Sequence, residues 1–572
     1  MAPGTSRGQQ DGIVTGRRRV VVVADDSPPD VLRAVVDRYR DDEVFVLAPA
    51  PYEEWHLDAP HRYLRLDKES NVQWYLKLYG PVDRIVDTRR RWPKAHEAAL
   101  RRLLFHLVPD GEYVIPRSAL RGYRAGNPLE TRLATFARAL SEADPDEVQD
   151  GVSDGASDDV VDDDFPELSR AVAEVRVDRE EIVLRKNGRH YLKLSDRWAN
   201  RMLSTRRLET TTVRELALLP ELRFASLTTV DSLGASAPRQ GLETTVDVPP
   251  LHLRHYSGRI GVVSNALAFT ANEILPDSFR HHLSNSRNRR LVQADENFAR
   301  IPQHVRPTRE LPGSYYLLDS ENSGHYGHLM TEVISRLWGW DRAKQDAPDL
   351  KAVLRVRHPG EREPQLERTV LGAYGIPPED VVAVGEPVFL ESMYAATPMF
   401  HNARPHYVHP EVRAVWRRIR EGLTAEPGPT WDRVFVSRKD TLGNRRCLNR
   451  ADVEEYFAGA GFEVIYPEEH SLGRQAEIFA KARVIAGFGG SGMFNALFAE
   501  RLEHLVVLTH EAYTARNEVL IALPLGVRLH YFWNRPAVPH PPGGWSEEAY
   551  KSDWSFDLVG HRRELRALVR SL

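Results

Sequence analysis

The sequence contains a single cysteine, Cys447, among 572 residues. Disulfide-stapled secreted domains and thiolate metal sites need several cysteines, so both classes are excluded. The chain also lacks an uninterrupted apolar run of about 18 residues, the length of a membrane-spanning helix, and its N-terminus lacks the apolar core of a signal peptide. We therefore expect a cytoplasmic protein with no transmembrane segment.

A strong excess of charge is also missing. The chain has 77 basic and 81 acidic residues, a formal net charge of −4. A nucleic-acid-binding domain would be clearly basic, so we expect no nucleic-acid partner. The hydrophobic content of 42% is instead that of a globular protein, and the length predicts two to four domains.

The N-terminal part predicts a Rossmann-like α/β domain over residues 17–140, after a disordered tail over 1–16. Short apolar strands alternate there with helices, at 20–24, 44–47, 85–86 and 113–115 for the strands and 30–40 and 93–107 for the helices. Residues 82–115 faintly resemble the late strands of a class I methyltransferase. No glycine-rich loop follows the first strand, so we expect a degenerate, non-catalytic docking or scaffold domain without an S-adenosylmethionine site.

An acidic segment separates this domain from the rest of the chain. Residues 141–164 contain eleven Asp or Glu and no Lys or Arg. Such a run repels itself and buries little apolar area, so it predicts a linker; metal binding by it is the weaker interpretation. Residues 165–255 show short strands without a clear period, and we interpret them as a connecting α+β region.

A glycine-rich turn lies within RVIAGFGGSGMFNALFAE, residues 483–500. A short β-branched strand precedes it, the glycines at 487, 489, 490 and 492 form it, and a helix is predicted to open near Gly492. Free N–H groups and the positive end of the helix dipole would face a ligand there. The turn therefore predicts an anion site that includes Gly489, Gly490, Ser491 and Gly492.

A basic loop is predicted at the same edge of the sheet. Strand 434–436 runs into Ser-Arg-Lys-Asp-Thr at 437–441, and Arg445 and Arg446 follow. Further strands at 462–466 and 505–508 alternate with helices, which predicts a parallel sheet whose strands all end at one edge. Ligands bind such sheets outside the carboxyl ends of the strands, so Arg438, Arg445 and the turn should lie together.

The turn is open to a second interpretation. Gly487, Gly489 and Gly492 satisfy the G-x-G-x-x-G dinucleotide fingerprint, and Glu511 stands near the distance expected of the ribose-binding acid. The fingerprint usually follows the first strand of its domain, however, whereas this turn follows at least the third strand of its lobe. An NAD-dependent oxidoreductase is therefore the second hypothesis, and a turn that only packs is the third.

Catalytic candidates come from HYGHLMTEVISRLWGWD, residues 325–341. Apolar residues recur there at helical spacing, and His328, Glu332 and Arg336 form a narrow polar stripe beside them. His328 and Glu332 are separated by one helical turn, so their side chains can meet. Polar groups on a mostly buried helix need a partner or a task, and we interpret this pair as catalytic.

Three segments in order carry a family resemblance: 325–341, 434–449 and 463–499. From about residue 311 to 534 the chain resembles glycosyltransferase family 61, which includes bacterial capsular-polysaccharide enzymes. The resemblance implies a GT-B fold of two facing Rossmann-like lobes, a nucleotide-sugar donor, usually a UDP-sugar, and inversion at the anomeric carbon. Gly489 stands where the family usually has a histidine, and this departure leaves open a non-catalytic nucleotide- or carbohydrate-binding subunit.

The leading hypothesis is an inverting hexosyl- or pentosyltransferase of cell-surface polysaccharide biosynthesis. Glu332 or His328 would take the acceptor proton, and the donor would be bound by Arg438, Arg445, Gly489, Gly490, Ser491, Gly492 and Asn495. We expect no metal and no cofactor. The expected partners are the donor, a glycan or polysaccharide acceptor and, peripherally, a membrane-bound biosynthetic complex.

The predicted layout follows from these assignments. It places the first transferase lobe at 256–425, the nucleotide-sugar-binding lobe at 426–540 and a helical segment at 541–572. The last segment has an amphipathic pattern that includes Leu565 and Leu568. We expect its helix to cross back to the first lobe, as in many GT-B enzymes.

Overall fold

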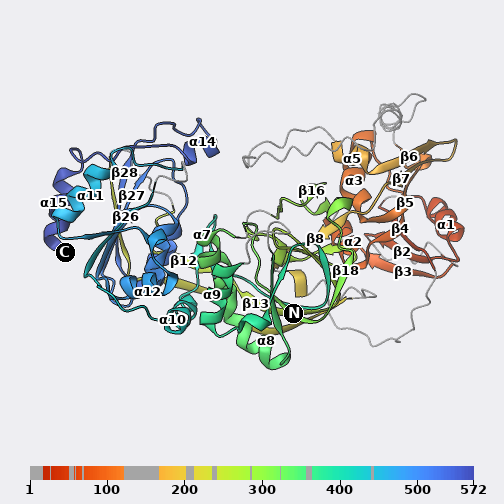
Figure 1. Cartoon of the computed structure of the whole chain (residues 1–572). Helices are drawn as coiled ribbons and strands as arrows, with labels where there is room; N and C mark the ends of the chain where they lie inside the picture. The colour runs from red at the N-terminus through yellow and green to blue at the C-terminus, as the bar shows by residue number, and fades with distance from the viewer. Residues whose placement is uncertain are drawn as a thin grey trace. The chain divides into compact units, whose positions relative to one another are not determined.

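The structure is a computed structural model that describes residues 17–25, 27–49, 57, 59–66, 70–120, 166–196, 198–200, 211–234, 241–283, 286–322, 324–355, 364–439 and 444–572. The predicted tail, residues 121–165 with the whole predicted linker at 141–164, and residues 440–443 of the basic loop lie outside these ranges. The described chain forms two compact units. Unit 1 contains the described residues up to 192 and residues 293–300, and unit 2 contains the remaining described residues (Figure 1).

Unit 1 is built on a seven-stranded sheet of order β3-β2-β1-β4-β5-β7-β6. Strands β1 to β5 are parallel, and β7 runs antiparallel to β5 and β6. The strands are β1 (Arg19–Val23), β2 (Glu43–Ala48), β3 (His61–Arg65), β4 (Val82–Asp87), β5 (Leu107–Pro116), β6 (Val172–Val177) and β7 (Glu181–Lys186), and the helices are α1 (Pro29–Arg38), α2 (Ser70–Tyr79), α3 (Pro93–Leu103) and α5 (Pro166–Arg170).

The predicted N-terminal α/β domain is therefore present, but two of its strands come from beyond residue 140. The two strands β6 and β7, which the sequence assigns to the connecting region, complete the sheet. Valines on the β1, β2 and β4 strands pack with α1 in one buried cluster. Such β-branched strands, buried on both faces, are what a covered parallel sheet requires.

The first lobe of unit 2 has a mixed sheet centred on the long strand β13 (Leu251–Val263). Its parallel part is β21-β18-β19-β20, while β13 pairs antiparallel with β21, β14 and β9. The elements are β9 (Thr211–Leu219), β14 (Leu267–Phe269), β15 (Glu273–Ile274), β18 (Arg309–Leu317), β19 (Lys351–Arg355), β20 (Val381–Val384), β21 (Val388–Ala396), α8 (Trp340–Asp346) and α9 (Gln365–Tyr374). A mixed α/β fold is thus confirmed, but this lobe is only partly parallel, and a GT-B pair of lobes stays a prediction.

The second lobe has the predicted parallel sheet, in the order β11-β28-β27-β26-β24-β25. Its strands are β11 (Thr229–Leu233), β24 (Arg433–Val436), β25 (Glu463–Ile465), β26 (Val484–Phe488), β27 (His504–His510) and β28 (Arg528–Asn534), and its helices are α11 (Arg450–Gly459), α12 (Leu472–Lys481), the 3-10 helix η11 (Ser491–Phe498) and α13 (Asn517–Leu525). The sequence did not predict β11, which comes from the connecting region.

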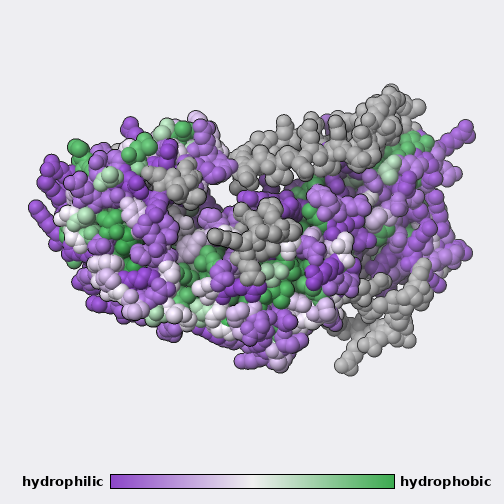
Figure 2. All heavy atoms as spheres, viewed as in Figure 1, coloured by the Kyte–Doolittle hydropathy of each residue, from purple (hydrophilic) through white to green (hydrophobic). Residues whose placement is uncertain are grey.

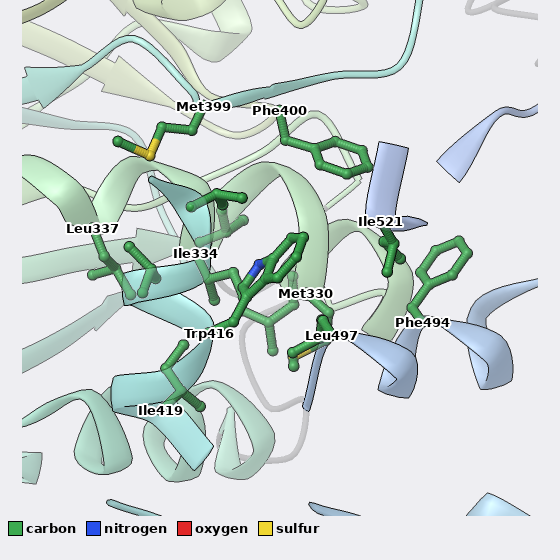
Figure 3. Close-up of a cluster of buried hydrophobic side chains, with 14 of the residues drawn as sticks. Met330, Ile334, Leu337, Met399, Phe400, Trp416, Ile419, Phe494, Leu497 and Ile521 are labelled. Carbon is green, nitrogen blue, oxygen red and sulfur yellow. The ribbon is translucent and has the colours of Figure 1, made fainter. Parts of the chain in front are cut away.

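One buried core joins the two lobes. Helix α10 (Val412–Gly422) places Trp416 between residues of the first lobe, such as Met330 and Ile334, and residues of the second, such as Leu497 and Ile521 (Figure 3). All of these side chains are at most 3% exposed. The lobes of unit 2 are therefore held together by apolar burial.

The C-terminal helix α15 (Arg562–Ser571) does not cross to the first lobe. Its Leu565 and Leu568 pack in a cluster with Phe435 and Phe457 of the second lobe. The prediction of a crossing was wrong because this face of the second sheet is itself apolar and takes the helix as its cover. None of the helices in the described ranges combines the length and apolar character needed to cross a bilayer.

Candidate functional site

The strand order of the second lobe reverses between β24 and β26. The chain leaves β24 for β25 on one side, then crosses to β26 and continues outward to β27 and β28. The crevice outside the carboxyl ends at such a switch point is where open α/β sheets bind ligands. Arg438 follows β24 and the glycine turn follows β26, so both lie at this point.

The glycine turn uses part of its own backbone internally. Strand β26 continues to Phe488, Gly489 N–H donates to the Leu508 carbonyl at 2.9 Å, and Gly490 N–H donates to Glu518 Oε1 at 2.9 Å. The helix that follows is of the 3-10 type and begins at Ser491. Of the four predicted backbone donors, the N–H groups of Ser491 and Gly492, which open the helix, are therefore the ones placed to meet an anion.

A buried glutamate, which the sequence analysis missed, supports this turn. Glu518 is 1% exposed and also accepts a hydrogen bond from Tyr513 Oη at 3.1 Å. Burial raises the pKa of Glu518, although its hydrogen bonds act in the opposite direction. Its helix, NEVLIALPL, is otherwise mostly apolar, and a lone acid in such a helix is the signal that could have indicated its role.

Gly489, which stands where the resembled family usually has a histidine, is closely packed. A Cβ atom added to Gly489 would lie 3.2 Å from Thr509 Cβ and Oγ1 and 3.4 Å from Tyr513. A histidine at this position would therefore require Thr509 to move by a few tenths of an ångström. The site is built around a glycine here, with cations supplied from elsewhere.

Two arginines reach the turn from the neighbouring loop. A Cβ atom added to Gly490, whose φ is +140°, would lie 3.2 Å from Arg445 Nη2 and 3.9 Å from Arg438 Nη1. The predicted convergence of Arg438, Arg445 and the turn is therefore seen in the fold. Two guanidinium groups beside a helix N-terminus form a strongly anion-attracting surface.

Arg445 is held in place by the C-terminal segment. Its φ of +54° is uncommon for a residue with a side chain, and its N–H donates to the Lys551 carbonyl at 3.0 Å. The guanidinium lies 4.9 Å from the ring of Tyr513 and 5.1 Å from that of Tyr550. These two aromatic contacts, which lie more than 60 residues away along the chain, had no local signal in the sequence.

The segment with the catalytic candidates packs directly on the helix after the turn. Tyr326 Oη donates to Asn495 Oδ1 at 2.5 Å. A Cβ atom added to Gly327 would lie 3.0 Å from Phe494 and 3.2 Å from Ser491 Cβ, so only glycine allows this approach. The segment that contains the catalytic candidates thus contacts the helix that contains predicted donor-binding residues.

Asn495 serves this junction. Its side chain is fully buried, accepts from Tyr326 and donates to Gln475 Oε1 at 2.8 Å. These bonds tie the two segments together. Because the Asn495 side chain has no exposed surface, it is not placed to contact the donor as the sequence predicted.

His328 and Glu332 meet as their spacing predicts, with His328 Nδ1 and Glu332 Oε1 2.9 Å apart. The helical run is not one regular helix: α7 (Tyr326–His328) passes into a π-helical turn at Leu329–Val333, then a 3-10 segment at Ile334–Gly339. Glu332 lies in the π-helical turn. Such turns are frequent at functional sites, where they redirect side chains.

Arg280, which the sequence analysis missed, completes the pair. Arg280 Nε donates to the same Glu332 Oε1 at 2.8 Å. Burial by itself would raise the pKa of Glu332, but the charges and hydrogen bonds of Arg280 and His328 outweigh it and hold the pKa well below its usual range. Glu332 is therefore a stable carboxylate and a weak base, suited to orienting His328.

A small cavity adjoins this cluster. It measures about 20 Å³, the size of a water molecule, and it is lined by polar side chains that include Arg280, His281, Glu332 and His401. Burial, followed by the charge of Arg280, lowers the pKa of His281 to about 3. In the ranges that the structure describes, no three His, Cys, Asp or Glu side chains group closely enough to bind a metal. The prediction of a metal-independent reaction stays a prediction.

Comparison with known proteins places the site within a matched region. Residues 326–506 match the family model described as Glycosyltransferase 61, a span that includes His328, Glu332, Arg438 and the turn. No curated protein matches the chain.

Solved structures with similarity to the chain include the MycE methyltransferase of the mycinamycin biosynthetic pathway, with Mg and SAH, at 18% identity and a TM-score of 0.20 over 30% of this chain and 42% of that one. They also include the fibrillarin/Nop5p complex, at 14% identity and a TM-score of 0.18 over 30% of this chain and 74% of that one. The chain thus spans less than half the length of the MycE protein.

Proposed function

We propose that the chain moves a sugar from a nucleotide-sugar donor to a glycan or polysaccharide acceptor with inversion. The match of residues 326–506 to the family model described as Glycosyltransferase 61 supports this proposal. A UDP-sugar is the donor we propose, and a hexose or pentose the sugar. Synthesis of a cell-surface polysaccharide, from the cytoplasmic side, is the role we propose for the reaction.

One observation carries this proposal. Arg438 and Arg445 converge on Gly490 at the switch point of a parallel sheet, and the segment with His328 packs on the helix that begins at this turn. A diphosphate would be bound by the two guanidinium groups and the first N–H groups of η11. The sugar attached to it would extend toward His328.

The residues then have distinct tasks. An acceptor hydroxyl oxygen attacks the anomeric carbon from the face opposite the diphosphate, and the bond from that carbon to the phosphate oxygen breaks. We propose that His328 Nε2 takes the hydroxyl proton while Nδ1 stays bonded to Glu332, which steadies the imidazolium. Arg438 and Arg445 stabilise the negative charge on the leaving diphosphate.

Binding measurements separate this proposal from its alternatives. Thermal unfolding should be shifted upward by UDP or another nucleoside diphosphate and not by NAD or NADH. Nucleotide release should then be measured with a panel of nucleotide sugars, with and without glycan acceptors. Stabilisation by NAD(H) alone would favour the oxidoreductase, and nucleotide binding without sugar hydrolysis or transfer by any donor would favour a binding subunit.

A further inference from the structure

Leu227 is the most exposed of the large hydrophobic residues in the described chain, with 90% of its surface accessible. Hydrophilic side chains cover most of the face shown in Figure 2, as on most protein surfaces. A single exposed leucine needs no explanation by itself. Its surroundings, however, show that its exposure is built into the fold.

The two neighbours of Leu227 fix it to the end of helix α13. Ser226 Oγ donates to the Leu523 carbonyl at 2.6 Å, and Thr228 Oγ1 donates to the Ala522 carbonyl at 2.8 Å. These bonds satisfy carbonyls of the last helical turn. Leu227 thus lies between two residues that are both anchored to the helix end, and its own side chain is exposed.

A cationic groove lies near this leucine. Helix α10 presents Arg413, Arg417 and Arg420 at intervals of one helical turn, and the three line a groove of about 470 Å³. The lining also includes the partly exposed Leu525, with the buried Trp416 and Leu497 beneath. Arg420 pairs with Glu500 at 2.7 Å. Arg413 and Arg417 are exposed, and within the described residues neither side chain has a hydrogen-bonding or ion-pair partner.

The leucine and the groove form one continuous surface. Leu525, which lines the groove, is followed by Gly526, and a Cβ atom added to Gly526 would lie 3.7 Å from Leu227 Cβ. Leu227, Leu525, Arg413, Arg417 and Arg420 together form what we call the amino-edge surface. It lies where α13 ends and where strands β11 and β28 begin, so it is at the opposite edge of the sheet from the glycine turn.

We propose that the amino-edge surface docks on an anionic membrane. Leu227 enters the boundary between head groups and acyl chains, while Arg413 and Arg417 contact lipid phosphates. The acids on this surface do not oppose it strongly, because Glu500 and Glu421 both pair with Arg420. The carboxyl edge, with its anion site, faces away from the bilayer in this arrangement.

Vesicle flotation of the full chain tests the proposal. Vesicles of phosphatidylcholine containing phosphatidylglycerol should carry the protein upward in low salt, and vesicles of phosphatidylcholine alone should not. Since each arginine near an anionic surface contributes about a fivefold gain in partitioning, Arg413→Gln with Arg417→Gln should weaken binding roughly twenty- to thirtyfold. Leu227→Ser should weaken it on the order of tenfold, as a partly inserted leucine would.

Matched controls come from the other basic surface of unit 2. Arg562→Gln with Arg566→Gln removes two exposed charges from α15, and Val559→Ser removes a hydrophobic residue that is 84% exposed. Neither should change flotation, and all variants should keep the parent's unfolding temperature and UDP response. The proposal is overturned if the chain ignores anionic vesicles, if the control variants lose binding equally, or if inorganic phosphate is bound at this surface without any vesicle binding.

Discussion

The pair formed by His328 and Glu332 allows a sharp test of which residue takes the proton. In Glu332→Gln the side-chain oxygen can still accept from Arg280 Nε and His328 Nδ1, now 2.8 and 2.9 Å away. The shape of the site is kept and the negative charge is lost. This variant therefore isolates the electrostatic contribution of the carboxylate.

The size of the effect follows from the geometry. A carboxylate and an imidazolium about 4 Å apart interact by about 4 kcal/mol at an effective dielectric constant of about 20. The charge of Arg280 is the same in the parent and in the variant, so it drops out of the comparison, and the expected loss is at most about 4 kcal/mol, or about 10³-fold in rate. His328→Asn removes the proposed base itself and should reduce transfer by about 10²- to 10⁴-fold.

The assay is steady-state sugar transfer, with UDP affinity measured on each variant by calorimetry. Both variants should bind UDP like the parent, because neither residue contacts the diphosphate in the proposed arrangement. Glu321→Gln is the matched control, since Glu321 lines the same cavity and pairs with Arg289 instead. A Glu332→Gln loss larger than that of His328→Asn, with UDP binding intact, would refute the assignment and make Glu332 the base.

Three further predictions concern binding, stability and pH. Arg438→Ala should weaken UDP binding by about 1.5–3 kcal/mol in calorimetry, whereas Lys439→Ala, which loses only an exposed ion pair, should not. Equal losses in the two variants would contradict the proposed binding of the diphosphate by Arg438. Truncation after Asp557 removes α15 with its two buried leucines, Leu565 and Leu568, and should lower the free energy of unfolding by about 3–6 kcal/mol in denaturant titrations. An unchanged midpoint would contradict this packing. Burial lowers the pKa of His510 to about 3, from about 6.5 in the unfolded chain, so the folded state favours the neutral imidazole. The free energy of unfolding should therefore rise with pH between these two values, by up to about 1.4 kcal/mol per pH unit. His510→Gln should flatten this slope, and an identical slope in the variant would show that His510 does not cause it.

The sequence predicted those parts of the site whose signals are local. The β-branched run before the glycines predicted strand β26, and the spacing of His328 and Glu332 predicted their contact. The order of strands predicted that Arg438 and the turn share an edge, because a parallel sheet has only one carboxyl edge. Each of these inferences depends on residues that are close together in the chain.

The parts that were missed depend on long-range packing. Arg280 precedes Glu332 by 52 residues and has no periodic pattern around it. The long strand β13 alternates apolar and polar residues only weakly, and the antiparallel pairing that it makes is decided by partners elsewhere in the chain. Helix α15 was correctly predicted as amphipathic, but the pattern of a helix does not specify which surface it covers.

Strand β11 has a consequence for how the chain reaches its fold. Thr229 pairs with Arg528, a residue made nearly 300 positions later during synthesis. In the second sheet β11 therefore has no partner until β28 has been made, and β28 must then pair with a strand whose N–H and C=O groups are still unpaired. Folding of this lobe thus requires the synthesis of β28, and nascent fragments that end before it would expose an unprotected strand edge prone to aggregation.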